Sequence, residues 1–383
     1  MKRRMGPALI ALACTAMGAS KANARERWTS AQANAWYAKQ PWLVGANYVP
    51  ANAINQLEMW QAATWDPVAI DREFGWAQAM GMNTMRVFLH DKLWQQDPKG
   101  FKTRINAFLA IAKTHGIRPM LVFFDSCWDP DPKLGPQHPP IPGVHNSGWV
   151  QSPGAAILAD SAARPQLKAY VQDIVGTFAK DDRVLAWDVW NEPDNLAPAY
   201  AATPGKVAQV QAILGDVFRW AQAMNPTQPL TSPVWSHDGD WAPGGKRKPI
   251  EAIQLDQSDI VSFHNYDWPE TFEAKIKQLL PYDRPILCTE FMARGNGSTF
   301  DGSLPIGKRY NVAMMNWGFV DGKTQTRLPW NSWYHPYTLT QPTIWFHDML
   351  KADGTPYRQS EVDLIKRLVD APTSNRQPPR KGG

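Results

Sequence analysis

The chain has 383 residues, of which 44% are hydrophobic, enough for one large core or two modest ones, and this excludes a disordered protein except at the ends. Its formal net charge of +5 comes from 40 Lys and Arg against 35 Asp and Glu. Four of the positive charges stand within the first 24 residues, which contain no acidic residue, so the rest of the chain has 36 against 35, or +1. The basic charge therefore gives no support to a nucleic-acid partner.

The first residues have the pattern of a secretory signal. Basic residues at positions 2–4 precede an apolar stretch over 8–17, and the small residues of 22–24 follow. We expect cleavage after Ala24, so that residues 1–24 are a signal peptide and the protein is secreted or periplasmic. A lipoprotein signal ending at Cys14 is a weaker alternative, because Ala11 stands where a larger aliphatic residue is usual. No apolar run is long enough to span a bilayer, so we expect no membrane span.

Strand-like runs alternate with amphipathic helical patterns along most of the chain. Eight runs are predicted strands, and they cover residues 42–48, 83–89, 118–124, 184–190, 230–235, 260–266, 286–291 and 312–317. The predicted helices between them include 67–80, 101–115, 164–180, 206–224 and 270–280. Eight βα repeats predict an α/β fold, a (β/α)8 TIM barrel, as a single domain over residues 25–370.

Two long loops and the tail interrupt this alternation. The loop over 125–160 follows the third strand and is rich in Pro, so we expect a stiff wall over the barrel mouth. A second loop over 318–333 follows the eighth strand. Residues 371–383 are rich in Pro and basic residues, and we expect a disordered tail.

The tryptophans are a second signal, because many of the 19 lie in loop-like contexts. Flat aromatic faces in exposed loops suit the C–H faces of sugar rings, while the alternative is ordinary packing in the core. The residues in question are Trp60, Trp65, Trp94, Trp128, Trp149, Trp235, Trp241, Trp268, Trp330 and Trp333. After removal of the signal only Cys127 and Cys288 remain as cysteines, and we expect two free thiols.

The run over 184–190 delivers Asn191-Glu192 to a strand end, and Pro193 then stops the strand. Glu192 should therefore lie at a carboxyl end of the barrel, where barrel enzymes keep their chemistry. Glu290 ends the seventh strand, opposite the fourth in an eight-stranded barrel. Cleavage of a glycosidic bond needs such a pair of carboxyl groups. A purely structural reading of Glu290 is a buried salt bridge, with Arg86 as the partner.

Three further residues accompany the pair. Arg86 stands in an otherwise apolar strand and must find a carboxylate, and pairing with Glu290 would keep that group ionised. His264 and Tyr266 stand two residues apart on the sixth strand and point to one side of it, so both can face the barrel axis. Tyr266 can donate to Glu290, whereas a His in such a place is otherwise a satisfied core residue.

With these motifs the chain resembles the retaining glycoside hydrolases of clan A, and within them family five, the cellulase and mannanase family. The resemblance implies Glu192 as the proton donor, Asn191 as the ligand of the hydroxyl next to the anomeric carbon, and Glu290 as the nucleophile. It also implies that Arg86 orients the nucleophile and that His264 and Tyr266 surround the cleavage site. Trp317 falls where the family has an eighth-strand tryptophan as the sugar platform.

One departure concerns the third strand, where the family commonly has a histidine and this chain has Phe124-Asp125-Ser126-Cys127-Trp128. Asp125 could take over a hydrogen bond to substrate, or the alignment could be shifted by one or two residues. We count Asp125, Trp128 and Trp235 among the candidate substrate-binding residues.

The expected function is that of a secreted retaining glycoside hydrolase that cleaves β-glycosidic bonds in a poly- or oligosaccharide by double displacement, acts as a monomer and needs no metal or cofactor. Mannan, glucan and xylan are the candidate substrates, and endo and exo action both stay open. One alternative is an inactive carbohydrate-binding barrel. The other is an amide or ester hydrolase, whose only candidate nucleophile, Cys127, lacks a partnered His in its sequence context.

Overall fold

The computed structural model describes residues 24–372. The predicted signal peptide lies outside the described residues except for Ala24, and the predicted tail lies outside them after its first two residues. Among residues 24–372, no helix is both long enough and apolar enough to cross a membrane.

Eight parallel strands form the sheet, in the order β5-β4-β3-β2-β1-β8-β7-β6. A single backbone bridge between Val234 and Phe263 joins the ends of this order, so the sheet closes into a barrel. The strands are β1 (Val44–Tyr48), β2 (Thr84–Phe88), β3 (Arg118–Val122), β4 (Ala186–Asp188), β5 (Leu230–Thr231), β6 (Val261–His264), β7 (Ile286–Glu290) and β8 (Ala313–Asn316). All eight predicted strands are present, which confirms the TIM barrel.

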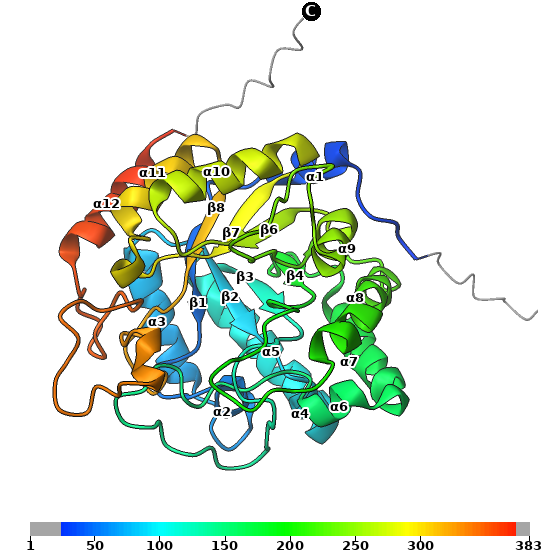
Figure 1. Ribbon diagram of the computed structural model, residues 1–383, viewed down its shortest axis with the longest axis horizontal. Coiled ribbons are helices and arrows are strands. Elements are labelled where there is room, and N and C mark those ends of the chain that lie inside the picture. The colour runs from blue at the N-terminus through cyan, green and yellow to red at the C-terminus, as the bar shows by residue number, and fades with distance from the viewer. Residues whose placement is uncertain (1–23, 373–383) are drawn as a thin grey trace, which may run out of the picture.

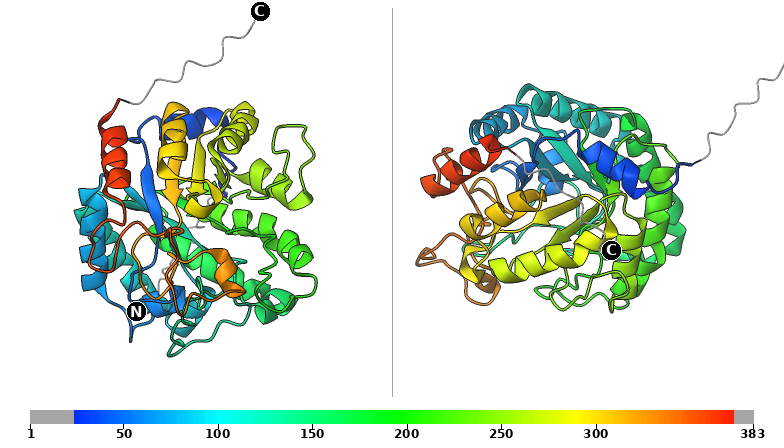
Figure 2. Two further views of the ribbon diagram at one scale, coloured as in Figure 1. Left: turned by 60° about the vertical axis from the view of Figure 1, so that its left-hand side comes forward. Right: turned by 90° about the horizontal axis from the view of Figure 1, so that it is seen from above.

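Helices surround the barrel on its outside (Figures 1 and 2). The helices are α1 (Ser30–Tyr37), α2 (Gln56–Trp60), α3 (Pro67–Ala79), α4 (Asp91–Gln96), α5 (Pro98–Thr114), α6 (Ala155–Ala159), α7 (Arg164–Phe178), α8 (Lys206–Gln222), α9 (Pro249–Gln257), α10 (Pro269–Leu279), α11 (Phe300–Arg309) and α12 (Gln359–Asp370), with short 3-10 turns at Ser161–Ala163, Leu280–Tyr282, Arg294–Asn296 and Trp330–Trp333. All five predicted helices are confirmed. Several begin with proline in the first turn, where its missing N–H leaves no intrahelical bond unmade.

The amino-terminal end of the barrel is filled and covered. Ala33 and Tyr37 of α1 join a buried apolar cluster with side chains such as Met120, Leu287 and Met315 from the strands. The Tyr37 hydroxyl also donates to the carbonyl of Asn311, just before β8. Ligands therefore have access only from the opposite end, where the carboxyl ends of the strands carry polar side chains.

Candidate active site

Arg86 on β2 organises the carboxyl end of the barrel. Its guanidinium is fully buried and donates to the carboxylates of Glu290 and Asp188 and to the side-chain oxygens of Asn47 and Asn191, at 2.6–3.0 Å. Five hydrogen bonds use all five N–H groups of the guanidinium, so the side chain has one orientation. The predicted pairing of Arg86 with Glu290 is confirmed, at 2.8 Å between Nη1 and Oε1.

Glu290 is the last residue of β7, and both of its carboxylate oxygens are held. Arg86 donates to Oε1, and the Tyr266 hydroxyl donates to Oε2 at 2.7 Å, as the sequence predicts. The side chain is 7% exposed, which leaves an edge accessible to a ligand. A carboxylate fixed by two donors and partly open to a cavity is ready to act as a nucleophile.

Glu192 has a different set of partners. It follows β4 with a left-handed backbone (φ 40°), a conformation that is uncommon for a residue other than glycine and that occurs at functional sites. Its Oε2 accepts from the Asn195 amide at 2.7 Å and from the Cys127 thiol at 3.2 Å. Burial raises the pKa of Cys127 well above its usual value, so the group that contacts Glu192 is a neutral S–H donor.

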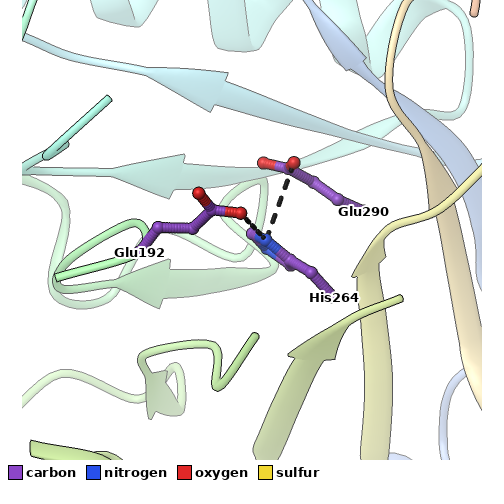
Figure 3. Close-up of side chains that lie close together, drawn as sticks. All are labelled: Glu192, His264 and Glu290. Carbon is purple, nitrogen blue, oxygen red and sulfur yellow. Dashed lines mark hydrogen bonds and ion pairs between the residues drawn. The ribbon is translucent and has the colours of Figure 1, made fainter. Parts of the chain in front are cut away.

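His264 on β6 lies between the two carboxyl groups (Figure 3). Its Nδ1 is 2.8 Å from Oε1 of Glu192 and 3.6 Å from Oε2 of Glu290. Burial lowers the pKa of His264 to about 3, so the ring is neutral at ordinary pH despite the neighbouring carboxylates. Its Nε2 is buried and has no hydrogen-bond partner among the described residues.

The two carboxyl groups differ in the protonation state that their surroundings favour. Burial raises the pKa of both Glu192 and Glu290, and each negative charge opposes the other across a short gap. At Glu290 the cation Arg86 and the Tyr266 hydroxyl counteract that rise, whereas neutral donors alone contact Glu192. The geometry therefore favours one shared proton, on Glu192, with Glu290 ionised.

The same three groups are also the candidate metal ligands. One oxygen of Glu192, one oxygen of Glu290 and a ring nitrogen of His264 all lie within 4.8 Å of one another. Arg86 and Tyr266 already occupy both oxygens of Glu290, so a metal ion would compete with these donors. The expectation that the reaction needs no metal stays a prediction.

A cavity of about 320 Å³ opens above the two glutamates, within the size range of pockets for small ligands. All the predicted substrate-binding residues except Arg86 and His264 line it, and those two are buried in contact with the glutamates. The lining members of the predicted set are Asp125, Trp128, Asn191, Trp235, Tyr266 and Trp317.

The ten loop tryptophans divide into three groups, and the members of one, Trp65, Trp94 and Trp268, neither line the cavity nor are fully buried. Trp128, Trp235, Trp330 and Trp333 line the cavity, as expected for a sugar site. The ligand-facing reading is wrong for Trp60, Trp149 and Trp241, which are at most 2% exposed and pack in the core, because loops near a strand end can fold back onto it.

Asp125 and Asn191 are both held by the protein. Asp125 accepts from the Trp149 indole N–H at 2.7 Å and from the Asn191 amide at 2.9 Å. Asn191 in turn accepts from Arg86 through its Oδ1. Asp125, which follows β3, thus orients Asn191.

Sequence reasoning missed Asp188, Asn195 and the thiol of Cys127 as members of the site. Asp188 carries a detectable signal, since it is a carboxylate inside an apolar strand, as Arg86 is a cation inside one. Cys127 and Cys288 are both free thiols, as predicted.

The chain matches a known protein family over most of its length. The family model Cellulase (glycosyl hydrolase family 5) matches residues 65–335, which is most of the chain. The chain belongs to glycosyl hydrolase family 5. No curated protein matches this family 5 hydrolase in sequence.

Solved structures share the fold of this family 5 hydrolase. A GH5_18 protein from Streptomyces cattleya in complex with Manβ1-4GlcNAc has a TM-score of 0.58 at 12% identity, over 88% of this chain and 83% of that one. An exo-β-1,4-mannosidase from Opitutaceae bacterium strain TAV5 has a TM-score of 0.55 at 19% identity, over 85% and 60%. An endo-β-1,4-mannanase from Thermotoga petrophila has 0.54 at 13%, over 87% and 77%. At these identities the similarity establishes the fold of the chain.

Proposed function

We propose that this protein is a secreted retaining β-glycosidase that works by double displacement. The observation that carries the proposal is the short gap between an oxygen of Glu192 and one of Glu290, within 4.8 Å. Retaining enzymes hold their carboxyl groups about 5–5.5 Å apart, whereas inverting ones leave about 6.5–9.5 Å for a water molecule. Arg86 and Tyr266 favour the ionised form of Glu290, which suits a nucleophile. Glu192 has only neutral partners, which suits a proton donor.

In the first step Glu290 attacks the anomeric carbon, and the bond from that carbon to the leaving oxygen breaks. Glu192 gives its proton to the leaving oxygen, which departs as a neutral hydroxyl. Arg86 and Tyr266 keep the attacking carboxylate ionised and aligned. The product is a glycosyl ester on Glu290.

In the second step a water molecule attacks the same carbon, and Glu192, now ionised, takes its proton. The ester bond to Glu290 breaks, and the sugar leaves with its original anomeric configuration. His264 stays neutral throughout and donates to or accepts from Glu192 without adding a charge.

β-Mannosides are the substrate class that we propose first, among the mannans, glucans and xylans that the sequence leaves open. Of the three solved structures compared above, one is a complex with a mannose-containing disaccharide, one is a mannosidase and one is a mannanase. Stacking surfaces on Trp128 and Trp317 suit any of these pyranose rings, so the choice rests on those names.

The test compares the wild type with Glu192→Gln and Glu290→Gln on aryl β-glycosides of mannose, glucose and xylose. Glu290→Gln should lose roughly 10⁴-fold or more in kcat on every substrate, because the nucleophile is gone. Glu192→Gln should lose far less on a dinitrophenyl leaving group, which needs no proton, than on a poor one. Hydrolysis by the wild type should be unchanged in the presence of a metal chelator, because we expect no metal in the reaction. Wild-type rates in both variants would refute the mechanism, and an inverted first product would remove Glu290 as the nucleophile.

Export is the remaining part of the proposal and rests on the pattern of residues 1–24. Protein recovered from the periplasm or medium of an expressing bacterium should begin at Arg25, as measured by its intact mass.

A further inference from the structure

Two loops join over the mouth of the barrel. The first is 123–154, after β3, and the second is 317–358, after β8; together they are called the roof here. The backbone N–H of Asn146 donates to the carbonyl of Thr324 at 2.7 Å, and the side chain of Gln325 donates to the carbonyls of Ile141 and Val144. These bonds connect parts of the chain about 180 positions apart.

His145 adds two more bonds to this junction. Its backbone N–H donates to the hydroxyl of Ser332 and its Nδ1–H donates to the carbonyl of Leu328, each at 2.8 Å. Because Nδ1 carries the proton, Nε2 is a hydrogen-bond acceptor, and it has no partner among the described residues. This nitrogen is itself buried, and burial lowers the pKa of His145 to about 4, so the ring is uncharged at neutral pH. The ring lines the cavity above the glutamates.

Aromatic contacts carry the roof towards the other loops. Trp128 and Trp333 stack with ring centres 5.5 Å apart and planes 18° apart. Trp333 also meets Tyr200 of the loop after β4, edge to face at 5.2 Å, and Trp330 meets Tyr266 at the end of β6 at 5.2 Å. Loops after β3, β4 and β8 thus meet over the site.

The roof is closed towards β1 and β2, where a hollow of only about 20 Å³ remains beside Asn47, Phe88 and Trp149. The amide of Asn55 donates to the carbonyl of Gly148, and that of Gln56 donates to the carbonyl of Val150, at 2.8 and 2.7 Å. Trp149 packs at 5.6 Å against Trp317, the expected sugar platform. Among the described residues, the cavity is lined from the ends of β3 to β8 and from the loops after them, and not from those after β1 and β2.

The two sides of the scissile bond therefore differ. A proton donor must lie on the side of the leaving group, so the leaving group extends past Glu192, where Asn195, Pro198 and Trp235 line the cavity. The sugar that becomes attached to Glu290 lies on the other side, towards Trp317 and the closed part of the roof. A longer chain on that side would have to pass through the joined loops.

We infer that the enzyme takes the non-reducing end of a β-linked oligosaccharide into a blind pocket and releases one sugar at a time. The inference rests on the proposed function and adds the mode of action. The terminal sugar lies against the roof, where Trp128, His145 and Trp317 line the cavity. A chain end suits a closed wall, because no further sugar has to be placed beyond it.

The test uses β-1,4-linked pentasaccharides of mannose, glucose and xylose, each labelled at the reducing end with 2-aminopyridine. With the substrate that the enzyme hydrolyses, the first labelled product should be the tetrasaccharide, followed by the trisaccharide. A labelled di- or trisaccharide as the first product, or a labelled monosaccharide, would overturn the inference while the proposed function stands. Failure to hydrolyse any pentasaccharide or aryl glycoside would overturn both.

A second experiment uses a variant in which the two loops of the roof are less firmly joined. Gln325→Ala removes the bonds to Ile141 and Val144 without touching the glutamates. We expect at least a fivefold rise in the share of internal cleavage, measured on the same labelled pentasaccharide. The matched control is Trp345→Ala in the same loop, since Trp345 stacks on Tyr357 at 4.7 Å, away from the junction. The control should keep the wild-type product pattern, and an equal shift in both variants would contradict a specific role of the junction.

Discussion

The carboxyl ends of the strands and the roof above them are built by different means. At the strand ends, the buried cation Arg86 holds Glu290 and Asp188, and neutral side-chain donors hold Glu192. In the roof, aromatic rings, a neutral histidine and loop-to-loop bonds form the walls, as at Trp128, His145 and Gln325. The contrast teaches that the barrel supplies the reaction and the loops supply the shape that selects the substrate.

The largest expected effect tests the strand-end side of this comparison. Arg86→Lys keeps the charge but replaces five fixed N–H donors with three on a flexible stem, so Asp188, Glu290, Asn47 and Asn191 cannot all be satisfied. We expect kcat/KM on aryl glycosides to fall by about 10²- to 10³-fold, in line with the loss of a preorganised donor.

The matched control for this change is Arg118→Lys. Arg118 begins β3 at the other end of the barrel, where it donates to the carbonyl of Asp182 and to Gln40. Its replacement should change kcat/KM less than about twofold, as surface changes usually do. A loss of activity in the control equal to that of Arg86→Lys, with both proteins folded by circular dichroism, would show that the effect is one of general stability.

The strand-end residues could be predicted because their positions carry local information. Glu192 and Glu290 each follow an apolar strand, and a charged Arg86 inside a strand implies a buried partner. The hydrogen bonds that connect the two loops of the roof could not be predicted in the same way. Gln325 and Val144 are 181 positions apart, and nothing local marks them as partners. The buried Trp60 and Trp241 show the same limit, because sequence context alone does not separate a ring on a wall from a ring in the core.

A smaller effect concerns the pH dependence of the strand-end pair. In the wild type, kcat/KM should fall at low pH as Glu290 takes up a proton and at high pH as Glu192 loses its own, about tenfold per pH unit on each side. Burial raises the pKa of both groups from the ordinary carboxyl value, so both limbs lie at higher pH than for exposed carboxyls.

Glu192→Gln separates the two limbs. With a dinitrophenyl glycoside, kcat/KM reports the first step alone, and the variant should lose the alkaline limb and keep the acid limb. Loss of the acid limb instead would exchange the roles of the two glutamates. Asn195→Ala removes a donor that favours the ionised form of Glu192, so the alkaline limb should move to higher pH while the acid limb stays in place.

The smallest expected effect on activity comes from a carboxyl group in neither region. Glu73 of α3 accepts from the hydroxyl of buried Tyr48 and from the amide of Ala51, and it does not line the cavity. Burial raises its pKa to about 7. An unfolded chain ionises this group near its usual pKa of about 4.3, so the folded state loses stability as the pH rises from there through 7.

Glu73→Gln keeps the acceptor for Tyr48 and removes this loss. The variant should be more stable than the wild type by about 1–3 kcal/mol at pH 8, with no such gain at pH 4, as measured by urea unfolding. Exposed Glu270→Gln is the control and should change stability by less than about 0.5 kcal/mol at either pH. The alkaline limb of activity should not move in Glu73→Gln. If it does move, the alkaline limb reports the titration of Glu73, and the assignment of that limb to Glu192 is wrong.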